Sequence, residues 1–320
     1  MILQLLGTIL ALVLIFIFAI NKFSHQIERV AGERFKTVIR RITRNRYMGI
    51  ITGTAVTSII QSSTATTVMT VGLVNAGMLT FHESLGVILG ANIGTTITSQ
   101  LIALNLTAVA PFIIILGFLI LQFGGTYKHY GKSVFYFGLV FFCISLMSQV
   151  VTPLSENETM LKVLSHTNSL PIGILVGILF TLILQSSTVT MGLTIVLAST
   201  GVLNLEQSIG IMLGSNIGTV STALLAVIPM GIEAKKAAVA HLVFNVVGCV
   251  AILPLISFFT NLTEMFSTNL SQHIANMHLV FNIFATVVFL IFFKQFVLLI
   301  EWMSKLKLFN IDPKKWEPKV

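Results

Sequence analysis

The sequence carries one polar tetrapeptide twice, and this duplication constrains the fold more than any other feature. Gln61–Thr64 reads Gln-Ser-Ser-Thr and returns, 124 positions later, as Gln185–Thr188. The same shift, without a gap, aligns residues 53–98 with residues 177–222, and 21 of these 46 positions are identical. Self-similarity at a fixed shift is the signature of an internal repeat. The fold must therefore hold two copies of one unit, each with a polar break inside an apolar run.

The composition is that of an integral membrane protein. The chain is 55% hydrophobic and only 9% charged, with a mean hydropathy of +0.95. So few charges cannot cover a soluble globular domain, and several apolar runs approach the roughly 20 residues that span a bilayer. Cys143 and Cys249 lie in apolar runs, so we interpret them as packing residues rather than a disulfide. The net charge of +8 is assigned to loops on the negative inner side of the membrane, and no nucleic acid partner is expected.

The apolar runs predict an all-α membrane protein with about seven transmembrane helices, two of them broken, and two re-entrant helical hairpins. Residues 1–21 are expected to form the first transmembrane helix. Residues 22–46 form a basic segment whose apolar residues recur at helical spacing, which predicts an amphipathic helix on the cytoplasmic surface, with a solvated basic linker as the alternative. Repeat 1 covers residues 47–152, with a hairpin at 48–79, a broken helix at 84–104 and spans at 106–123 and 134–151. An extracellular loop, 153–170, leads to repeat 2 at 171–300, with a hairpin at 171–201, a broken helix at 207–228, spans at 237–259 and 277–299, and then a basic cytoplasmic tail at 301–320.

The hairpins are inferred from length. The apolar run 48–60 has about 13 residues, too few to cross a bilayer, and it ends at the polar tetrapeptide. A second short run follows, so the two are expected to meet at a polar tip and return to the side they came from. Gly90, Asn92 and Gly94 interrupt the next span, which predicts a break in its middle.

The basic residues predict the topology. With seven spans and two returning hairpins, 18 of the 19 Lys and Arg residues fall on one side of the membrane. The positive-inside rule then places the N-terminus outside and the C-terminus in the cytoplasm of a multi-pass cell membrane protein. Three spans separate the hairpins, so the second copy is expected to be inverted relative to the first. Inverted repeats with broken helices are the construction of secondary transporters, which bind their substrates near the midplane.

The chemistry of the two tips favours small ions. The middles of the predicted spans hold no Asp, Glu, Lys or Arg, so a carboxylate proton relay is not expected. A helix begins after each Gln-Ser-Ser, and its free N–H groups, dipole and hydroxyls favour an anion. Carbonyls freed at the breaks, together with side-chain oxygens of four amide residues, suit a hard cation such as sodium. These amide residues are Gln61, Asn92, Gln185 and Asn216.

The doubled motif resembles the signature repeats of the type II sodium–phosphate cotransporters. The resemblance rests on Gln61–Thr67 and Gln185–Thr190, on the Gly-Ala/Ser-Asn-Ile-Gly-Thr segments at 90–95 and 214–219, and on His241–Asn245. It implies sodium-driven transport of inorganic phosphate by alternating access, with sodium as coupling ion and no other cofactor or metal, in a lipid-embedded protein for which it also allows a homodimer. Many bacterial relatives carry a PhoU-like helical domain after the membrane part, and this chain is expected to be without one. Carried over by position, the phosphate-binding residues are Ser62, Ser63, Thr64, Ser186, Ser187 and Thr188. The sodium-binding residues are Gln61, Gln185, Asn92, Thr95, Asn216 and Thr219.

Other interpretations remain open. Ser, Thr and Gln in membrane helices often serve only helix packing, as do glycines spaced by four. The sequence His-Leu-Val-Phe-Asn occurs at 241–245 and 278–282, where interhelical hydrogen bonds are an adequate explanation. The tips are compatible with sodium-coupled transport or export of another anion, such as sulfate or a carboxylate, and with an anion channel. An intramembrane hydrolase would need Ser62 or Ser186 beside His241, but no nucleophile elbow surrounds either serine, so we do not expect an enzyme.

Overall fold

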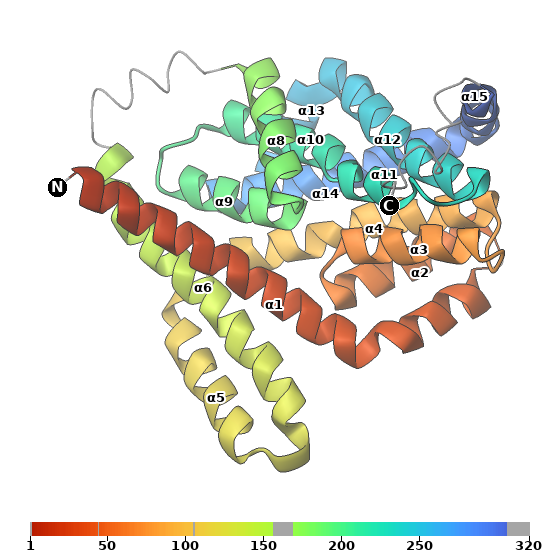
Figure 1. Ribbon diagram of the computed structural model, residues 1–320. Helices are drawn as coiled ribbons and strands as arrows, with labels where there is room; N and C mark the ends of the chain where they lie inside the picture. Colours follow the sequence, from red (N-terminus) through yellow and green to blue (C-terminus); the bar gives the residue numbers. More distant parts are fainter. Residues whose placement is uncertain (1, 44, 105, 156–168, 306–320) are drawn as a thin grey trace, which may run out of the picture. The chain divides into compact units, whose positions relative to one another are not determined.

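The computed structural model describes residues 2–43, 45–104, 106–155 and 169–305. Within these ranges the chain forms α-helices, short 3-10 segments and turns, and no strand (Figure 1). The predicted all-α class is confirmed, while the predicted loop 153–170 and tail 301–320 fall largely outside the described residues. The α-helices are α1 Ile2–Ile42, α2 Arg46–Ile60, α3 Ser63–Asn75, α4 Phe81–Ala103, α5 Ala110–Phe123, α6 Lys128–Ser155, α8 Leu170–Leu184, α9 Ser187–Ser199, α10 Leu205–Gly218, α11 Val220–Ala226, α12 Ile232–Ile252, α13 Ile256–Glu264, α14 Leu270–Ile291 and α15 Phe293–Ser304. The 3-10 segments are η1 Leu106–Ala108, η2 Gly125–Tyr127 and η3 Leu253–Leu255.

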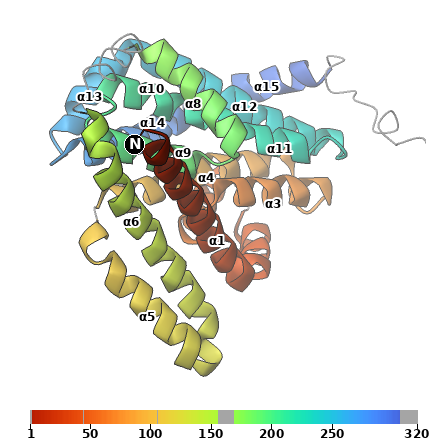
Figure 2. The same ribbon diagram turned by 60° about the vertical axis from the view of Figure 1, so that its left-hand side comes forward.

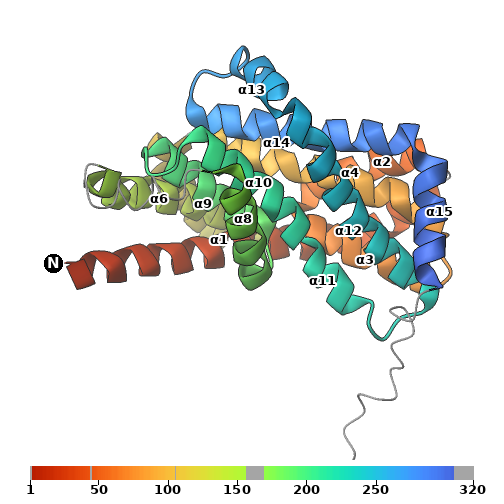
Figure 3. The ribbon, with the colours of Figure 1, turned by 90° about the horizontal axis from the view of Figure 1, so that it is seen from above.

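The chain divides into two compact units. Unit 1 holds Met1–Gly32, Thr96–Gly218 and Phe259–His278, and unit 2 holds Glu33–Thr95, Thr219–Phe258 and Leu279–Val320. In unit 1, α5 and α6 form an antiparallel pair (Figure 1, Figure 2), and α8 packs along α10 with α9 against both. In unit 2, α3 packs against α2, α11 and α12, and α12 also contacts α15 (Figure 3). The Gln-Ser-Ser-Thr segment of the first copy therefore belongs to unit 2, and that of the second copy belongs to unit 1.

Within the described residues, six helical segments are long and apolar enough to cross a membrane. They are Gly7–Arg29, Phe81–Ala103, Gly125–Thr152, Leu205–Ala226, Ile232–Glu264 and Leu270–Ile291. The seventh predicted span, 106–123, corresponds to α5, which has 14 residues. At 1.5 Å per residue this helix is about 21 Å long, whereas the hydrocarbon core is about 30 Å thick. The described residues thus hold six of the seven predicted spans as long apolar helices, and a membrane crossing by α5 stays a prediction.

The first helix differs from its prediction. The sequence suggested a span at 1–21 and a separate amphipathic helix at 22–46, but α1 runs without interruption over 41 residues. The chain has no proline before Pro111, so nothing between the apolar and basic parts removes a backbone donor or forces the helix to end. The helical character of the basic segment is confirmed as far as Ile42, and its place on a membrane surface stays a prediction.

The sequence repeat is also a repeat of structure. The bounds of α2 and α3 return in α8 and α9 with the same shift of 124 positions at all four ends. The helices that follow, α4 and α10, begin at Phe81 and Leu205, again 124 positions apart. The connecting turns repeat as well, because Gly77 and Gly201 both adopt positive φ angles, of 69° and 78°. The two copies therefore share one local fold from Arg46 and Leu170 onwards.

The break predicted in the first copy is absent, because α4 runs continuously through Gly90, Asn92 and Gly94. The glycines instead let the α4 backbone touch α2. A Cβ atom placed on Gly90 would lie 2.1 Å from the carbonyl oxygen of Ile50. The second break is reduced to a single residue: α10 ends at Gly218, α11 begins at Val220, and Thr219 between them keeps helical φ and ψ angles of −62° and −24°. The Gly-rich segments are thus primarily packing surfaces, and carbonyls freed by a break in α4 are not available.

Replacing Gly90 or Gly214 by alanine is expected to destabilise the protein. A Cβ on Gly214 would lie 2.0 Å from the carbonyl oxygen of Ile174, so either substitution must force two helix backbones apart, at a cost of about 1–3 kcal/mol or more. Gly72→Ala is the matched control, because a Cβ at this helical position meets nothing within 4 Å. Alanine should there raise stability by up to about 1 kcal/mol. Thermal unfolding in detergent measures both effects, and equal melting temperatures for Gly72→Ala and Gly90→Ala would contradict the packing role.

The last predicted span is displaced along the sequence. It was expected at 277–299, but α14 begins at Leu270 and ends at Ile291, where Phe292 separates it from α15. The polar residues of its first turns have partners within the protein. The side chain of Asn269 accepts a hydrogen bond from the Gln272 N–H at 2.9 Å, and the Asn276 amide oxygen accepts one from Gln100 Nε2 at 3.0 Å. Satisfied polar side chains extend this helix beyond the apolar run that predicted it.

Candidate functional site

The candidate site of the first copy is the tip between α2 and α3. Gln61 ends α2 in the left-handed conformation, with φ 60° and ψ 27°, and its N–H donates to the carbonyl of Thr57 at 2.7 Å. Its side-chain Nε2 donates to the carbonyl of Ser58. Ser62 then begins α3, and its Oγ accepts a hydrogen bond from the Ala65 N–H at 3.2 Å. Backbone and side chain together hold the tip in one defined conformation.

The second tip repeats this geometry. Gln185 has φ 50° and ψ 27°, and Ser186 caps α9 by accepting from the Val189 N–H at 3.3 Å. Among the described residues, Gln61 and Gln185 are the only non-glycine residues with positive φ. Helices that end in this conformation usually place Gly or Asn there, because a longer L-residue is strained. Strained residues cluster at functional sites, so a glutamine at this position in both copies is a candidate site residue.

A pair of threonines braces each tip one turn below it. Thr57 Oγ1 donates to Thr66 Oγ1 at 2.9 Å, and Thr181 and Thr190 are joined at the same distance. In both copies the pair continues to the tip, because Thr66 Oγ1 donates to the Ser62 carbonyl at 3.1 Å and Thr190 Oγ1 donates to the Ser186 carbonyl at 3.2 Å. These threonines were missed as site residues, although all four are identical between the aligned copies, which was the available signal.

In each copy the Gly-rich segment lies beside the helix that ends at the tip. A Cβ on Gly94 would lie 2.7 Å from Cβ of Thr57, which places the α4 segment from Asn92 to Thr95 beside the last turn of α2. In the second copy, a Cβ on Gly218 would lie 2.8 Å from Cβ of Thr181. The structure therefore brings Asn92 and Thr95 beside the first tip, and brings the end of α10, with Asn216, beside the helix that leads to the second tip. The predicted residues of these segments are all buried, namely Asn92, Thr95, Asn216 and Thr219.

The two glutamines differ in exposure. Gln61 is buried, whereas Gln185 is exposed in the isolated chain. The serines behave alike, since Ser62 and Ser186 are half-buried and each is followed by a buried serine in the first turn of the next helix. The threonines that complete the predicted anion sites, Thr64 and Thr188, are also half-buried. The hydroxyl residues of the two tips are thus equally exposed, whereas the two glutamines are not.

Asn92 is part of a buried network with α12. Its Nδ2 donates to Asn245 Oδ1 at 2.8 Å, and its Oδ1 lies 2.9 Å from Nε2 of His241. Both α12 residues are fully buried, and His241 Nδ1 and Asn245 Nδ2 have no hydrogen-bond partner. The interhelical bonds expected for the His-Leu-Val-Phe-Asn segment are present here. A sodium ion at Asn92 would have to share its Oδ1 with His241, which the sequence did not suggest.

Asn216 does not reproduce this network. Its Nδ2 donates to the carbonyl of Met212 on its own helix at 2.9 Å. Its side-chain oxygen is therefore oriented by α10 alone, whereas Asn92 is oriented by α12. The two asparagines hold aligned positions in different surroundings, so the copies are not interchangeable at this level.

Comparison with known proteins places the chain among transporters. A family model described as Na+/Pi-cotransporter matches residues 15–149 and 152–300. The chain is 34% identical over 283 residues to the uncharacterized protein YqeW of Bacillus subtilis, covering 88% of this chain and 92% of that protein. It is 26% identical over 269 residues to the "Putative inorganic phosphate export protein YjbB" of Escherichia coli K12, covering 82% of this chain and 49% of that protein. It therefore spans about half the length of YjbB.

A shorter similarity reaches animal proteins. Over 76 residues the chain is 37% identical to the sodium-dependent phosphate transport protein 2A of Rattus norvegicus, covering 24% of this chain and 12% of that protein. No solved structure matches the chain. The family model, by contrast, covers most of the sequence in two segments, in line with the two copies of the tip. On this basis the chain belongs to the Na+/Pi-cotransporter family, a family of transporters rather than enzymes.

Proposed function

We propose that this protein transports inorganic phosphate across the cell membrane together with sodium. The observation that carries the proposal is the repeated tip, in which a left-handed glutamine and an N-capping serine join two short helices in each copy. Membership of the Na+/Pi-cotransporter family supports the choice of phosphate, as do relatives named for phosphate export and for sodium-dependent phosphate transport.

Each tip offers opposite partial charges at one point of the chain. α2 ends where α3 begins, so the carbonyl end of one helix dipole meets the N–H end of the next within three residues. The N–H groups of Ser63 and Thr64 precede the first intrahelical bond of α3, which the Thr66 N–H makes to the Ser62 carbonyl. An anion therefore fits on the α3 side of the tip, and a cation fits on the α2 side.

The hydroxyls and amides complete this assignment. Ser62 Oγ accepts from the Ala65 N–H, so its own proton remains to be donated to a phosphate oxygen. Gln61 Nε2 donates to the Ser58 carbonyl, and we assign its Oε1, an oxygen ligand of the kind that sodium takes, to the sodium ion. The second tip supplies the matching hydroxyls of Ser186, Ser187 and Thr188, and its exposed Gln185 holds the position that aligns with Gln61. Bringing a cation and an anion together lowers the cost of burying either, which provides the physical basis of coupling.

The membrane arrangement is part of the proposal. α2, α3, α8 and α9 have 13 to 15 residues and are too short to cross a bilayer. We infer that each pair enters and returns on one side, that the second copy is inverted, and that the tips meet near the midplane. With 18 of 19 basic residues on one side, the N-terminus lies outside and the C-terminus in the cytoplasm. Transport then proceeds by alternating access to the tips.

The proposal is tested by phosphate uptake into liposomes containing the purified protein. An inward sodium gradient is expected to accelerate uptake of labelled phosphate, and an equal potassium gradient is not. Uptake that is identical in sodium and potassium would contradict coupling. If excess sulfate abolished phosphate uptake and was itself transported faster, the substrate assignment would be wrong. Relatives are named for export and for transport, so efflux from preloaded liposomes should be measured in the same preparation.

A further inference from the structure

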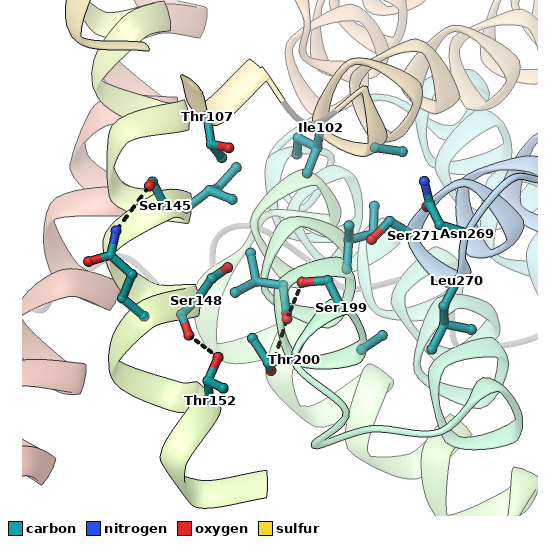
Figure 4. A pocket seen from close by; sticks show the side chains of 16 residues that line it. Ile102, Thr107, Ser145, Ser148, Thr152, Ser199, Thr200, Asn269, Leu270 and Ser271 are labelled. Atoms are coloured by element: carbon teal, nitrogen blue, oxygen red, sulfur yellow. Dashed lines mark hydrogen bonds between the residues drawn. The ribbon is translucent and has the colours of Figure 1, made fainter. Parts of the chain in front are cut away.

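A cavity of about 510 Å³ lies in unit 1, well along α9 from the Gln185–Thr188 tip (Figure 4). It is bordered by the last turns of α4 and α9, by the second half of α6 and by the start of α14. α9 begins at Ser187 next to the tip, and it contributes Ile195 to Ser199 to the cavity, about 12–18 Å further along at 1.5 Å per residue. The cavity is therefore separate from the tip but connected to it by one helix.

The helices that border the cavity place it at one membrane face. Lys128 and Ser148 are 20 positions apart on α6, and only Ser148 lines the cavity. That separation is about 30 Å along a helix, the thickness of the hydrocarbon core. Lys128 marks the cytoplasmic end of α6 by the positive-inside rule, so the cavity lies at the outer end.

The lining is polar but carries no charge in the described part of the chain. Nine of the sixteen lining residues have hydroxyl or amide side chains, and the others are apolar. At about 30 Å³ per water molecule, a volume of 510 Å³ holds about 17 waters. A space of this size accommodates a hydrated small ion and is much larger than a packing defect.

The hydroxyls suit ions of either sign. Ser199 Oγ donates to the Val196 carbonyl at 2.8 Å, so this hydroxyl presents oxygen lone pairs to the cavity (Figure 4). Ser145 Oγ, by contrast, accepts from Gln149 Nε2 at 3.5 Å, and its own proton can be donated. A lining without fixed charge favours neither sign, whereas rings of charged side chains select for cations or for anions.

An apolar contact lies along α9 between this cavity and the tip. The ring of Phe16, which is fully buried, lies against Gly192 on α9, and a Cβ on Gly192 would be 2.5 Å from its Cζ. The same built Cβ would lie 3.3 Å from Cδ1 of Ile102, a residue that also lines the cavity. On α9, Gly192 lies between Ser187 at the tip and Ile195 at the cavity. This contact therefore lies between the tip and the cavity along the helix.

We propose that the cavity is the outer vestibule through which hydrated phosphate and sodium reach the second tip, and that Phe16 on Gly192 is the barrier at its base. This inference rests on the proposed transport of phosphate. Its ligand chemistry is that of small hydrated ions held only by neutral hydroxyls and amides. The barrier has to move, or be bypassed, for the ions to pass from the vestibule to Ser186 and Ser187.

Cysteine labelling tests the vestibule independently of transport. The chain has two cysteines, Cys143 and Cys249, both buried, so a cysteine-free background needs two alanine substitutions. In that background Ser148→Cys should react with a membrane-impermeant disulfonated maleimide added outside. The bound reagent should then lower phosphate uptake at least tenfold. Asn261→Cys is the control: this residue of α13 is exposed and does not line the cavity, so labelling should leave uptake unchanged.

The outcomes separate the two proposals. If Ser148→Cys stays unlabelled from outside while the unlabelled protein transports phosphate, the vestibule is wrong and the transport function stands. If Ser148→Cys is labelled but the unmodified protein moves no phosphate, the transport function is wrong. If labelling leaves uptake unchanged, the cavity is open to water and lies off the path, which overturns the inference.

A second variant tests the barrier. Phe16→Ala should raise the rate at which the external reagent labels Thr188→Cys at the tip about tenfold or more, with Phe16→Leu intermediate. An unchanged rate in a correctly folded Phe16→Ala protein would show that this ring does not close the vestibule. Labelling of Ser148→Cys in the same membranes serves as the reference, because that position lies outside the barrier.

Discussion

Ser62→Gly and Ser186→Gly are each expected to lower phosphate flux by about 10- to 100-fold while the protein still folds and inserts. Both serines use their oxygen to cap a helix and retain a proton for an anion. A hydrogen bond to a charged group contributes about 1.5–3 kcal/mol, and each 1.4 kcal/mol is tenfold in affinity. The effect should appear mainly as a higher phosphate concentration for half-maximal uptake in liposomes.

Glycine is chosen because it distinguishes the two roles of each serine, as a phosphate ligand and as a helix N-cap. Glycine is tolerated at an N-cap at a cost of only a few tenths of a kcal/mol, whereas alanine costs about 1 kcal/mol. Ser62→Thr, which keeps both cap and hydroxyl, is the matched control and should retain most of the flux. Wild-type uptake by the double variant Ser62→Gly/Ser186→Gly would remove both serines from the phosphate site.

Gln61→Gly and Gln185→Gly are expected to abolish most sodium-dependent flux without loss of stability. Both positions have positive φ, which glycine adopts freely, so relief of about 1 kcal/mol of strain offsets glycine's entropic cost of about 0.5–1 kcal/mol. What is lost is the side-chain oxygen assigned to sodium. The sodium concentration for half-maximal uptake should therefore rise about tenfold or more, with thermal unfolding in detergent within a few degrees of wild type.

Asn is the conservative control at these positions, because it tolerates the left-handed conformation and keeps an amide that is one methylene shorter. Gln61→Asn should give intermediate flux at raised sodium. If Gln61→Gly transported normally, the left-handed turn itself would be sufficient and the glutamine side chain would have no part in binding. The serine and glutamine variants together distinguish a phosphate effect from a sodium effect.

The local fold of the repeat could be predicted from the sequence because its signals are local. Gln61–Thr64 interrupts an apolar run too short to span, and the helix ends at Ile60 and Leu184 fall beside the tetrapeptides. The left-handed glutamines could not be predicted, since glutamine has no preference for that conformation. The Thr57–Thr66 hydrogen bond was visible only as two identical positions in the alignment of the copies.

The errors came from contacts distant in sequence. Gly90 and Gly94 were interpreted as a break in the span, yet they lie against α2, whose residues are about 40 positions earlier. The α14 helix begins at Leu270 rather than at 277 because Asn276 is satisfied by Gln100. A hydropathy pattern cannot show which distant residue will contact a glycine or satisfy a polar side chain. The binding roles of the twelve predicted residues remain predictions that transport measurements have to decide.

The glycine contacts between α2 and α4, and between α8 and α10, restrict how this protein can move. Where two backbones touch without side chains between them, neither helix can slide or rotate past the other without a clash, because Gly53 and Val87, or Gly177 and Ile211, are already at contact distance. α2 is therefore locked to α4, and α8 is locked to α10. Any conformational cycle has to move each of these helix pairs as a rigid body. The hinges that it requires must lie in the segments outside the pairs.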